Sequence, residues 1–316
     1  MNVGYARGLI VIKITRLFMR FVRYFLGKLD YKHPLYRISY ALYIRWNAIS
    51  RLRKKKVTEM EVQIHAACHC NLNCAACNAF CPIIEETFAD TEVIKKDLAR
   101  LALLTDGNIK MLVISGGEPL LNPKLPEIIS CARSYFPNVN LQIITNGTLL
   151  TGAAVKFWES CRDNKAKISI TLYPIKINID KIKEIAEQYN VEVNYQDDTD
   201  IREKTMYCTP LDTSGGQDIK ESYRLCFMAN YCFTLENGRM YTCPVIAHMQ
   251  HFNSSFNQKF TVSKRDSIDI HEVGSIDEVL SFMCKPMPFC RYCNKKDRIN
   301  GIKWEVSKRD LSEWIF

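Results

Sequence analysis

The sequence predicts an α/β fold built on a parallel sheet, followed by a cysteine-rich tail. From residue 57 to about residue 200, short apolar strands alternate with amphipathic helices, which is the pattern of successive parallel β-α units. After about residue 205 this alternation fades and cysteines become frequent. We therefore divide the chain into residues 1–57, 58–215 and 216–316, with the second boundary at the linker-like stretch Ser214-Gly215-Gly216.

The basic arm, residues 1–57, differs from the rest of the chain in charge. It holds fourteen Lys or Arg and one acid, a net charge of +13, so the remainder carries about −4 of the chain's +9. Basic side chains recur every three or four residues in 9–27, and residues 35–53 form a second basic amphipathic segment, so two amphipathic helices are expected. They are either a helical pair packed on the body or a partner subunit, or an interfacial helix on the inner face of a membrane. Four charges within 9–27 argue against a membrane-spanning helix.

The elements of residues 58–215 follow from apolar runs and their flanking residues. The first helix is expected to begin at a capping residue, Asp90 or Thr91. In a parallel fold of this kind, functional loops follow the carboxyl ends of the strands. Strands are expected at 61–64, 110–114, 141–144, 167–172 and 191–195, and helices at 91–104, 124–135, 153–161 and 178–189.

Fourteen cysteines are many for a chain of 316 residues. The N-terminus lacks an uninterrupted apolar segment before a small-residue cleavage site, so we expect a cytoplasmic protein whose cysteines bind metal. Cys70, Cys74 and Cys77 have the spacing C-x3-C-x2-C. Three thiolates on one short loop can hold three irons of a four-iron cube and leave the fourth iron open for another ligand. A structural zinc loop is the alternative, but zinc needs a fourth protein ligand.

This cysteine spacing resembles that of the radical S-adenosylmethionine (SAM) superfamily, and three later motifs agree with it in order and distance. Ser115-Gly116-Gly117-Glu118-Pro119 resembles the family's GGEP turn, Thr145-Asn146-Gly147 the end of its third strand, and residues 168–174 its fourth strand. The resemblance covers about residues 60–200. It implies a partial (β/α)6 TIM-like barrel that binds a [4Fe-4S] cluster and SAM. It also implies reductive cleavage of SAM to a 5′-deoxyadenosyl radical, with an electron donor such as flavodoxin or ferredoxin.

The same resemblance implies roles for five residues at strand ends. Gly116 and Gly117 would let the backbone approach the methionine ammonium of SAM, with Glu118 in support of that turn. Asn146 and Thr171 would face the ribose or the methionine carboxylate. The alternative for these last two is an ordinary polar residue in a turn and in a strand.

A second set of cysteines lies in the tail. The patterns Cys226-x11-Gly238-x4-Cys243 and Cys290-x2-Cys293 resemble the SPASM and twitch modules, which hold auxiliary clusters. The shorter twitch pattern fits better because no cysteine follows Cys293, and it implies a second [4Fe-4S] cluster. A zinc ribbon is the structural alternative. The preferred ligands are Cys226, Cys243, Cys290 and Cys293. Cys232 is a fifth candidate.

The remaining cysteines have no paired spacing that suits a cluster. We expect them to be packed thiols in the core or beside the cluster loop. They are Cys68, Cys81, Cys131, Cys161, Cys208 and Cys284.

Residues 226–247 and 289–293 resemble a radical SAM group associated with genes for glycan and surface-polysaccharide assembly. This resemblance implies an oxidoreductase or epimerase that removes hydrogen from a carbohydrate or polyol. A peptide- or protein-modifying radical enzyme is the second candidate. A non-catalytic iron–sulfur scaffold or membrane-associated interaction protein is the third. Nucleic acid is not an expected partner, because the positive charge belongs to the arm.

Overall fold

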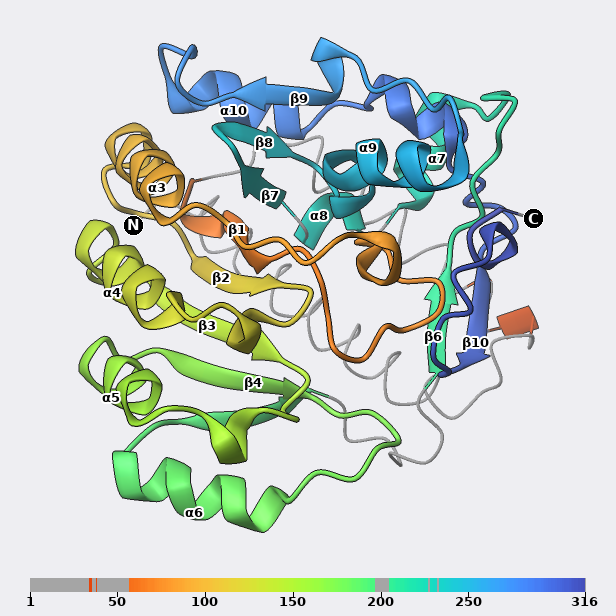
Figure 1. Cartoon of the computed structure of the whole chain (residues 1–316). Coiled ribbons are helices and arrows are strands. Elements are labelled where there is room, and N and C mark those ends of the chain that lie inside the picture. Colours follow the sequence, from red (N-terminus) through yellow and green to blue (C-terminus); the bar gives the residue numbers. More distant parts are fainter. Residues whose placement is uncertain are drawn as a thin grey trace.

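The structure, a computed structural model (Figure 1), describes residues 57–196, 205–226, 228–231 and 233–315, together with Pro34, Leu35 and Ile38. The two helices expected in the basic arm and the candidate ligand Cys232 lie outside the described residues. Within the described ranges, no helix has the length and apolar character needed to cross a membrane.

One eight-stranded sheet organises the fold, in the order β5-β4-β3-β2-β1-β7-β8-β9. Neighbouring strands from β5 to β7 in this order pair in parallel. β8 pairs antiparallel with β7, and β9 pairs antiparallel with β8. The predicted α/β fold with a TIM-like partial barrel is confirmed, and the five strands expected before residue 200 form in order. The bounds are β1 (Glu61–Ala67), β2 (Met111–Gly116), β3 (Asn140–Thr145), β4 (Lys167–Thr171), β5 (Val193–Gln196), β7 (Phe233–Glu236), β8 (Arg239–Tyr241) and β9 (Ser267–Asp269).

Four helices cover one face of the parallel strands (Figure 1) and correspond to the four predicted ones. The first of them begins where the sequence predicts, since the Asp90 side chain accepts a hydrogen bond from the Glu92 amide at 2.8 Å. These helices are α3 (Thr91–Thr105), α4 (Leu125–Tyr135), α5 (Val155–Asp163) and α6 (Ile179–Tyr189).

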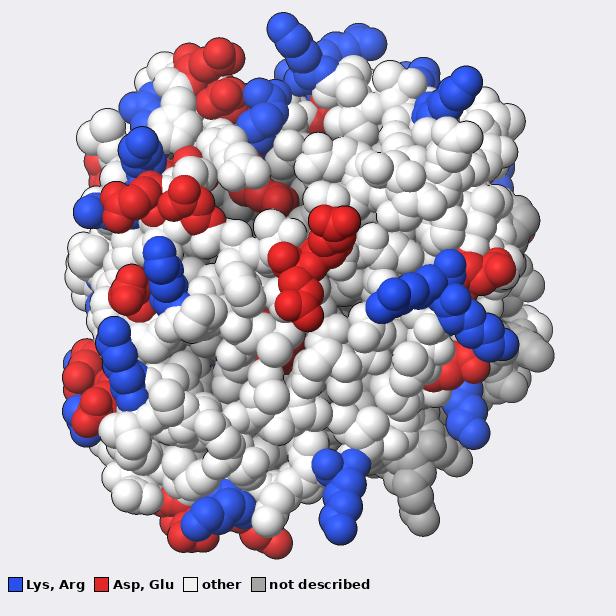
Figure 2. All heavy atoms as spheres, in the orientation of Figure 1, with Lys and Arg blue, Asp and Glu red and all other residues white. Residues whose placement is uncertain are grey.

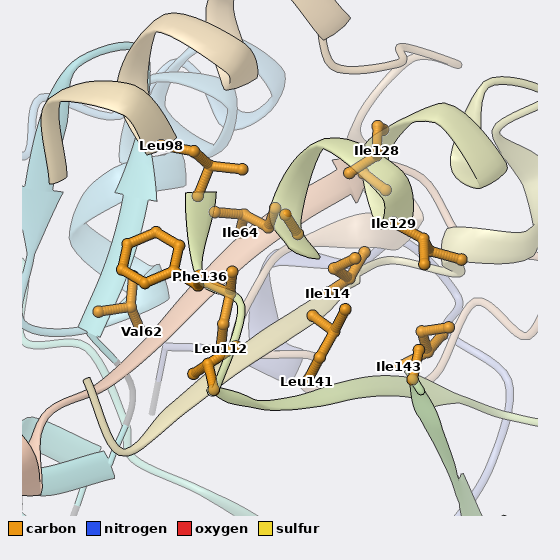
Figure 3. Packing of buried hydrophobic residues seen from close by; sticks show 14 of the residues in the cluster. Val62, Ile64, Leu98, Leu112, Ile114, Ile128, Ile129, Phe136, Leu141 and Ile143 are labelled. Carbon is orange, nitrogen blue, oxygen red and sulfur yellow. The ribbon is translucent and has the colours of Figure 1, made fainter. Parts of the chain in front are cut away.

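The main core lies between these helices and the sheet (Figure 3). Val62 and Ile64 of β1 and Leu112 and Ile114 of β2 are fully or almost fully buried and pack beneath Leu98 of α3. Fully burying one such side chain contributes about 1.5–3 kcal/mol. Side chains at the alternate positions of each strand face away from the helices. This inner face of the sheet is polar, and its residues include Gln63, His65, Ser115, Ser169, Thr171, Thr234 and Glu236.

The tail contributes a strand to the same sheet. β7 pairs in parallel with β1, with Val62 opposite Phe233 and Ile64 opposite Leu235. The turn from β7 to β8 contains Asn237 at φ 49° and Gly238 at φ 74°, the conformation of a two-residue hairpin. The proposed boundary at residue 215 therefore separates two segments of chain that share one sheet.

Most other elements of the tail lie beyond the carboxyl ends of the parallel strands (Figure 1), whereas the helix of residues 276–283 contributes Val279, Leu280 and Met283 to the main core. β6 (Thr205–Cys208) pairs with β10 (Ile299–Lys303) in a separate antiparallel ribbon. A second core surrounds Phe80, Phe252 and Trp314. The remaining helices are α7 (Ile219–Leu225), α8 (Met228–Tyr231), α9 (Pro244–Phe256) and α10 (Ile276–Met283). Short 3₁₀ helices are η1 (Val57–Glu59), η2 (Cys81–Ile83), η3 (Pro119–Leu121), η4 (Leu150–Gly152), η6 (Lys264–Asp266), η7 (Pro288–Tyr292) and η8 (Leu311–Glu313).

Charged side chains are interspersed on the face seen in Figure 2. Lys and Arg alternate with Asp and Glu along the edge where α3, α4 and α5 lie, and the centre of this face is uncharged except for a small group of acidic side chains. This distribution is compatible with the prediction that the body does not bind nucleic acid, which stays a prediction.

Candidate functional site

The cluster loop, residues 68–80, follows β1 at the carboxyl edge of the sheet. Asn73 at φ 46° and Ala76 at φ 54° turn its backbone sharply, and a left-handed conformation costs about 1–2 kcal/mol for an L-residue other than Asn. The turns bring the three predicted thiols together. Burial raises the pKa of the Cys70 thiol to about 12, and the neighbouring Cys74 and Cys77 add to the rise. Buried thiols this close together suit a shared metal cluster, which would take them as thiolates.

The end of the chain covers the cluster loop. The Trp304 indole N–H donates to Cys74 Sγ at 3.1 Å, and the Trp314 indole N–H donates to the Cys77 carbonyl at 3.0 Å. Tyr173, just after β4, also hydrogen-bonds the Cys74 thiol. Sequence reasoning missed these three aromatic residues, and Trp304 lies 230 residues from the cysteine that it contacts. No spacing pattern in the sequence connects them.

The two glycines of the GGEP turn pack directly against the cluster loop. A Cβ atom on Gly116, at φ 128°, would lie 2.2 Å from the Ala67 carbonyl oxygen. A Cβ atom on Gly117 would lie 1.8 Å from the His69 carbonyl oxygen. The Gly117 amide donates to the Ala67 carbonyl at 2.7 Å. The absence of side chains therefore allows a close backbone approach, and the backbone approached is the one that leads into Cys70.

Glu118 connects the GGEP turn to the end of β3. Its side chain is fully buried and accepts hydrogen bonds from Thr145 Oγ1 at 2.7 Å, the Asn146 amide at 2.9 Å and the Leu120 amide at 3.1 Å. Burial raises the pKa of the Glu118 carboxyl, and the hydrogen bonds from Asn146, Thr145 and Leu120 oppose that rise. Glu118 is therefore a positioning residue that holds two site loops in register.

Replacing Glu118 by Gln should lower the free energy of unfolding by about 1–3 kcal/mol, because an amide nitrogen would face N–H or O–H donors in a buried place. Thermal unfolding checks this. The matched control is Glu127→Gln on α4, where the carboxylate is half-exposed and forms only a surface ion pair. Equal unfolding of the two variants would contradict the linking role of Glu118.

Asn146 and Thr171 both lie at the carboxyl edge, and Asn146 contacts the cluster loop. Its side-chain amide donates to Asn71 Oδ1 at 2.8 Å and lies 3.8 Å from Cys70 Sγ. Thr171 ends β4 opposite Gln196 of β5 and is half-buried. The structure thus places Gly116, Gly117, Glu118 and Asn146 around the first cysteine set, with Thr171 farther along the same edge.

Four of the five tail cysteines line one enclosed cavity of about 40 Å³. Cys226 ends α7, Cys243 precedes α9, and Cys290 and Cys293 lie in the turn of η7. Burial raises the pKa of the Cys243 thiol far above its usual range, with Cys293, Cys226 and Cys290 adding to the effect. Cys226 and Cys243 precede Cys290 and Cys293 by a long stretch of chain, with a separation of 64 residues from position 226 to position 290. The fold nevertheless brings the four thiols together, as a shared ligand set requires.

A lysine ammonium lies beside this second cysteine set. Lys295 lines the same cavity, and its Nζ donates to Thr209 Oγ1 at 2.8 Å. Burial disfavours the charge of Lys295, but the nearby Cys226, Cys293 and Cys243 outweigh it and raise the lysine pKa. A cation here would offset part of the negative charge of a four-thiolate cluster.

The other described cysteines are not joined by disulfides. Cys81 is buried, and its thiol hydrogen-bonds Cys77, which lowers the pKa of the Cys77 thiol. Cys161 and Cys208 are buried, whereas Cys131 and Cys284 are partly exposed. Cys161 and Cys208 therefore occupy the packed positions predicted for thiols outside the clusters, and Cys131 packs against the edge of the main core, whereas Cys284 lies outside the described cores.

Residues 66–192 match the sequence profile of the radical SAM superfamily. This segment is similar to radical SAM domains. The matched range contains the three cysteines of the cluster loop, the GGEP turn and the strand-end residues Asn146 and Thr171. The similarity agrees with the expectation that this segment binds a [4Fe-4S] cluster and SAM.

Curated relatives match only part of the chain. The chain is 33% identical over 91 residues to a GTP 3′,8-cyclase of Helicobacter pylori, which is 28% of this chain and 28% of that protein. It is 32% identical over 80 residues to a GTP 3′,8-cyclase of Chlorobaculum tepidum, 24% of each chain. The chain thus spans about a quarter of the length of these relatives.

Among solved structures, the chain resembles BtrN in complex with AdoMet and 2-DOIA. The TM-score is 0.45 at 15% sequence identity, and the superposition covers 75% of this chain and 93% of BtrN.

Proposed function

We propose that this protein is a radical SAM enzyme that cleaves SAM reductively and removes a hydrogen atom from a carbohydrate or polyol, in an oxidation or an epimerisation. The observation that carries the proposal is the cluster loop, whose Cys70, Cys74 and Cys77 lie together between the GGEP turn and the end of the chain. A [4Fe-4S] cluster bound there supplies the electron that splits the C5′–S bond of SAM. Flavodoxin or ferredoxin is the class of donor that would provide it.

The protein's own residues would position the ligands and exclude water. Glu118 and the two glycines fix the GGEP turn. The backbone of this turn packs against the cluster loop, which supports a binding site there for the methionine part of SAM. Asn146 lies beside Cys70, where its amide can reach a ligand of the neighbouring iron. Trp304 and Trp314 cover the other side of the loop. A dry, fixed site limits the loss of a reactive species to solvent.

The polar inner face of the sheet supports a hydroxyl-rich substrate. Side chains from several strands, among them the partly exposed Gln63 and Glu236, bring donors and acceptors to this face. A sugar or polyol carries many hydroxyl groups that such side chains can hydrogen-bond. The resemblance of residues 226–247 to enzymes near glycan assembly genes agrees with this substrate class, including a role in surface glycan biosynthesis.

The experiment is to incubate the reconstituted protein with SAM, dithionite and deuterated sugars or polyols. Deuterium in the released 5′-deoxyadenosine is the expected result. Deuterium from a labelled peptide instead would favour the peptide-modifying alternative and overturn the carbohydrate assignment. No 5′-deoxyadenosine from protein with its full iron content would overturn the enzyme proposal.

We propose in addition that Cys226, Cys243, Cys290 and Cys293 bind an auxiliary [4Fe-4S] cluster. Replacing Cys243 by Ala should lower the iron content from about eight to about four atoms per chain, because only the second cluster loses a ligand. Iron analysis of anaerobically purified protein checks this, with Cys284→Ala as the control. Unchanged iron together with the loss of one zinc would favour the zinc ribbon instead.

The cellular setting proposed for the enzyme is the cytoplasm. The basic arm would place it at the anionic inner face of the membrane or would pack on the protein or a partner subunit.

A further inference from the structure

A third group of metal-ligating side chains lies on the inner face of the sheet, apart from both cysteine sets. His65, Glu236 and His248 each bring one ligand atom to within 4.8 Å of the others. His65 belongs to β1, Glu236 is the last residue of β7, and His248 belongs to α9. The group therefore joins residues 58–215 to the tail.

Strand register explains why these side chains meet. Ile64 of β1 lies opposite Leu235 of β7, so the next residues, His65 and Glu236, are neighbours with side chains on the inner face. Both strands run in the same direction, so the pair lies toward the carboxyl edge, where the cluster loop begins. α9 packs against β7 and β8 and adds His248 from above the inner face.

The hydrogen bonds of the group leave a carboxylate oxygen unsatisfied. His65 Nδ1 and His248 Nε2 lie 2.8 Å apart, so one ring donates to the other. Glu236 Oε2 lies 3.9 Å from His248 Nε2, and it is buried with no hydrogen-bond partner among the described residues. His248 Nδ1 is likewise buried without one. A buried polar atom left unpaired costs about 1–3 kcal/mol, and native proteins seldom place two such atoms in one spot.

The charge states of the three groups suit a bound cation. His65 and His248 are almost fully buried, and burial lowers the pKa of the His65 ring to about 4 and that of the His248 ring further, so both rings are neutral and each has one nitrogen lone pair that a metal ion can take. Burial raises the pKa of the Glu236 carboxyl to about 7. A nearby positive ion would offset that desolvation and keep the carboxylate charged.

We propose that His65, Glu236 and His248 bind a single divalent transition-metal ion, with Zn²⁺ and Fe²⁺ as the best-suited ions. Two imidazoles and one carboxylate are the donor set of catalytic zinc sites and of mononuclear non-haem iron sites. A small movement that replaces the His–His hydrogen bond would let one nitrogen of each ring and the Glu236 oxygen bind the same ion. Three protein ligands leave open positions for water or for an oxygen atom of a substrate. The Glu236 side chain is 21% exposed, so those positions are accessible.

The test is anaerobic dialysis of the iron-loaded protein against Zn²⁺, with zinc and iron counted by mass spectrometry. Loading the cysteine sites with iron first keeps zinc from binding there, and a constant iron count verifies this. Wild-type protein should retain one zinc per chain. Glu236→Gln and His248→Gln should bind zinc at least about tenfold more weakly. The matched control is His271→Gln, because His271 also lies 2.8 Å from a carboxylate, that of Asp97, but outside this group.

Three results would overturn the proposal: no retained zinc in the wild type, equal zinc in Glu236→Gln and wild type, or loss of zinc in His271→Gln to the same degree. Because the glutamine side chain matches glutamate in shape, Glu236→Gln tests the site even where a histidine variant does not fold. Zinc counting does not depend on SAM cleavage. A failure here therefore leaves the proposed function standing, and an inactive enzyme that still binds zinc leaves this site standing.

Discussion

Replacing Cys74 by Ala should reduce the release of 5′-deoxyadenosine at least about 100-fold and remove about four irons per chain. Cys74 is the middle thiol of the cluster loop and the one that accepts the Trp304 indole hydrogen bond. Without it, two thiolates remain on the loop, and the cluster loses one of its three protein ligands. The measurement is product release from SAM and dithionite, together with iron analysis of the same sample.

The matched control for this variant is Cys131→Ala. Cys131 is a partly exposed thiol on α4, on the helical side of the sheet. That variant should keep both activity and iron. If Cys74→Ala retained its biological activity in cells despite the loss of iron, the protein would act as a scaffold or interaction protein and the enzyme proposal would fail.

Replacing Gly117 by Ala should destabilise the protein by about 3 kcal/mol and disrupt the cluster loop. The new Cβ would lie 1.8 Å from the His69 carbonyl oxygen and 2.9 Å from the Cys70 amide nitrogen. Both are backbone atoms, so no side chain can move aside and the loop itself must shift. Thermal unfolding and iron content after reconstitution measure the two effects.

Gly152→Ala provides the control for steric change at a glycine. A Cβ at Gly152, in η4, would meet no atom within 4 Å. This variant should unfold near the wild-type temperature and bind the same amount of iron. Similar behaviour of the two alanine variants would mean that the close approach at Gly117 does not hold the loop in place.

The parallel part of the fold could be predicted because its information is local. Each strand is a short apolar run, each helix has an amphipathic period, and Asp90 caps the first helix. The first cysteine set could also be identified, since all three thiols lie within eight residues and the GGEP turn follows at a fixed distance. Local pattern and spacing carry both kinds of information without knowledge of the tertiary fold.

Contacts across long stretches of chain could not be predicted in this way. The role of Glu118 as a link to Thr145 and Asn146 depends on how two loops pack. The placement of β7 beside β1 depends on which sheet edge is available, and β7 itself is only four residues long. His248 is an ordinary helix residue in the sequence, and it meets His65 only because α9 crosses the inner face.

The pairing of β7 with β1 also sets an order for assembly. β1 precedes every other described strand, and its second neighbour in the sheet is synthesised about 170 residues later. Until then β1 has an open edge of unpaired amide and carbonyl groups, next to a loop rich in reactive thiols. Exposed strand edges favour association between chains, and distant pairings form slowly. The contacts of Trp304 and Trp314 with the cluster loop therefore form only after the tail has been synthesised.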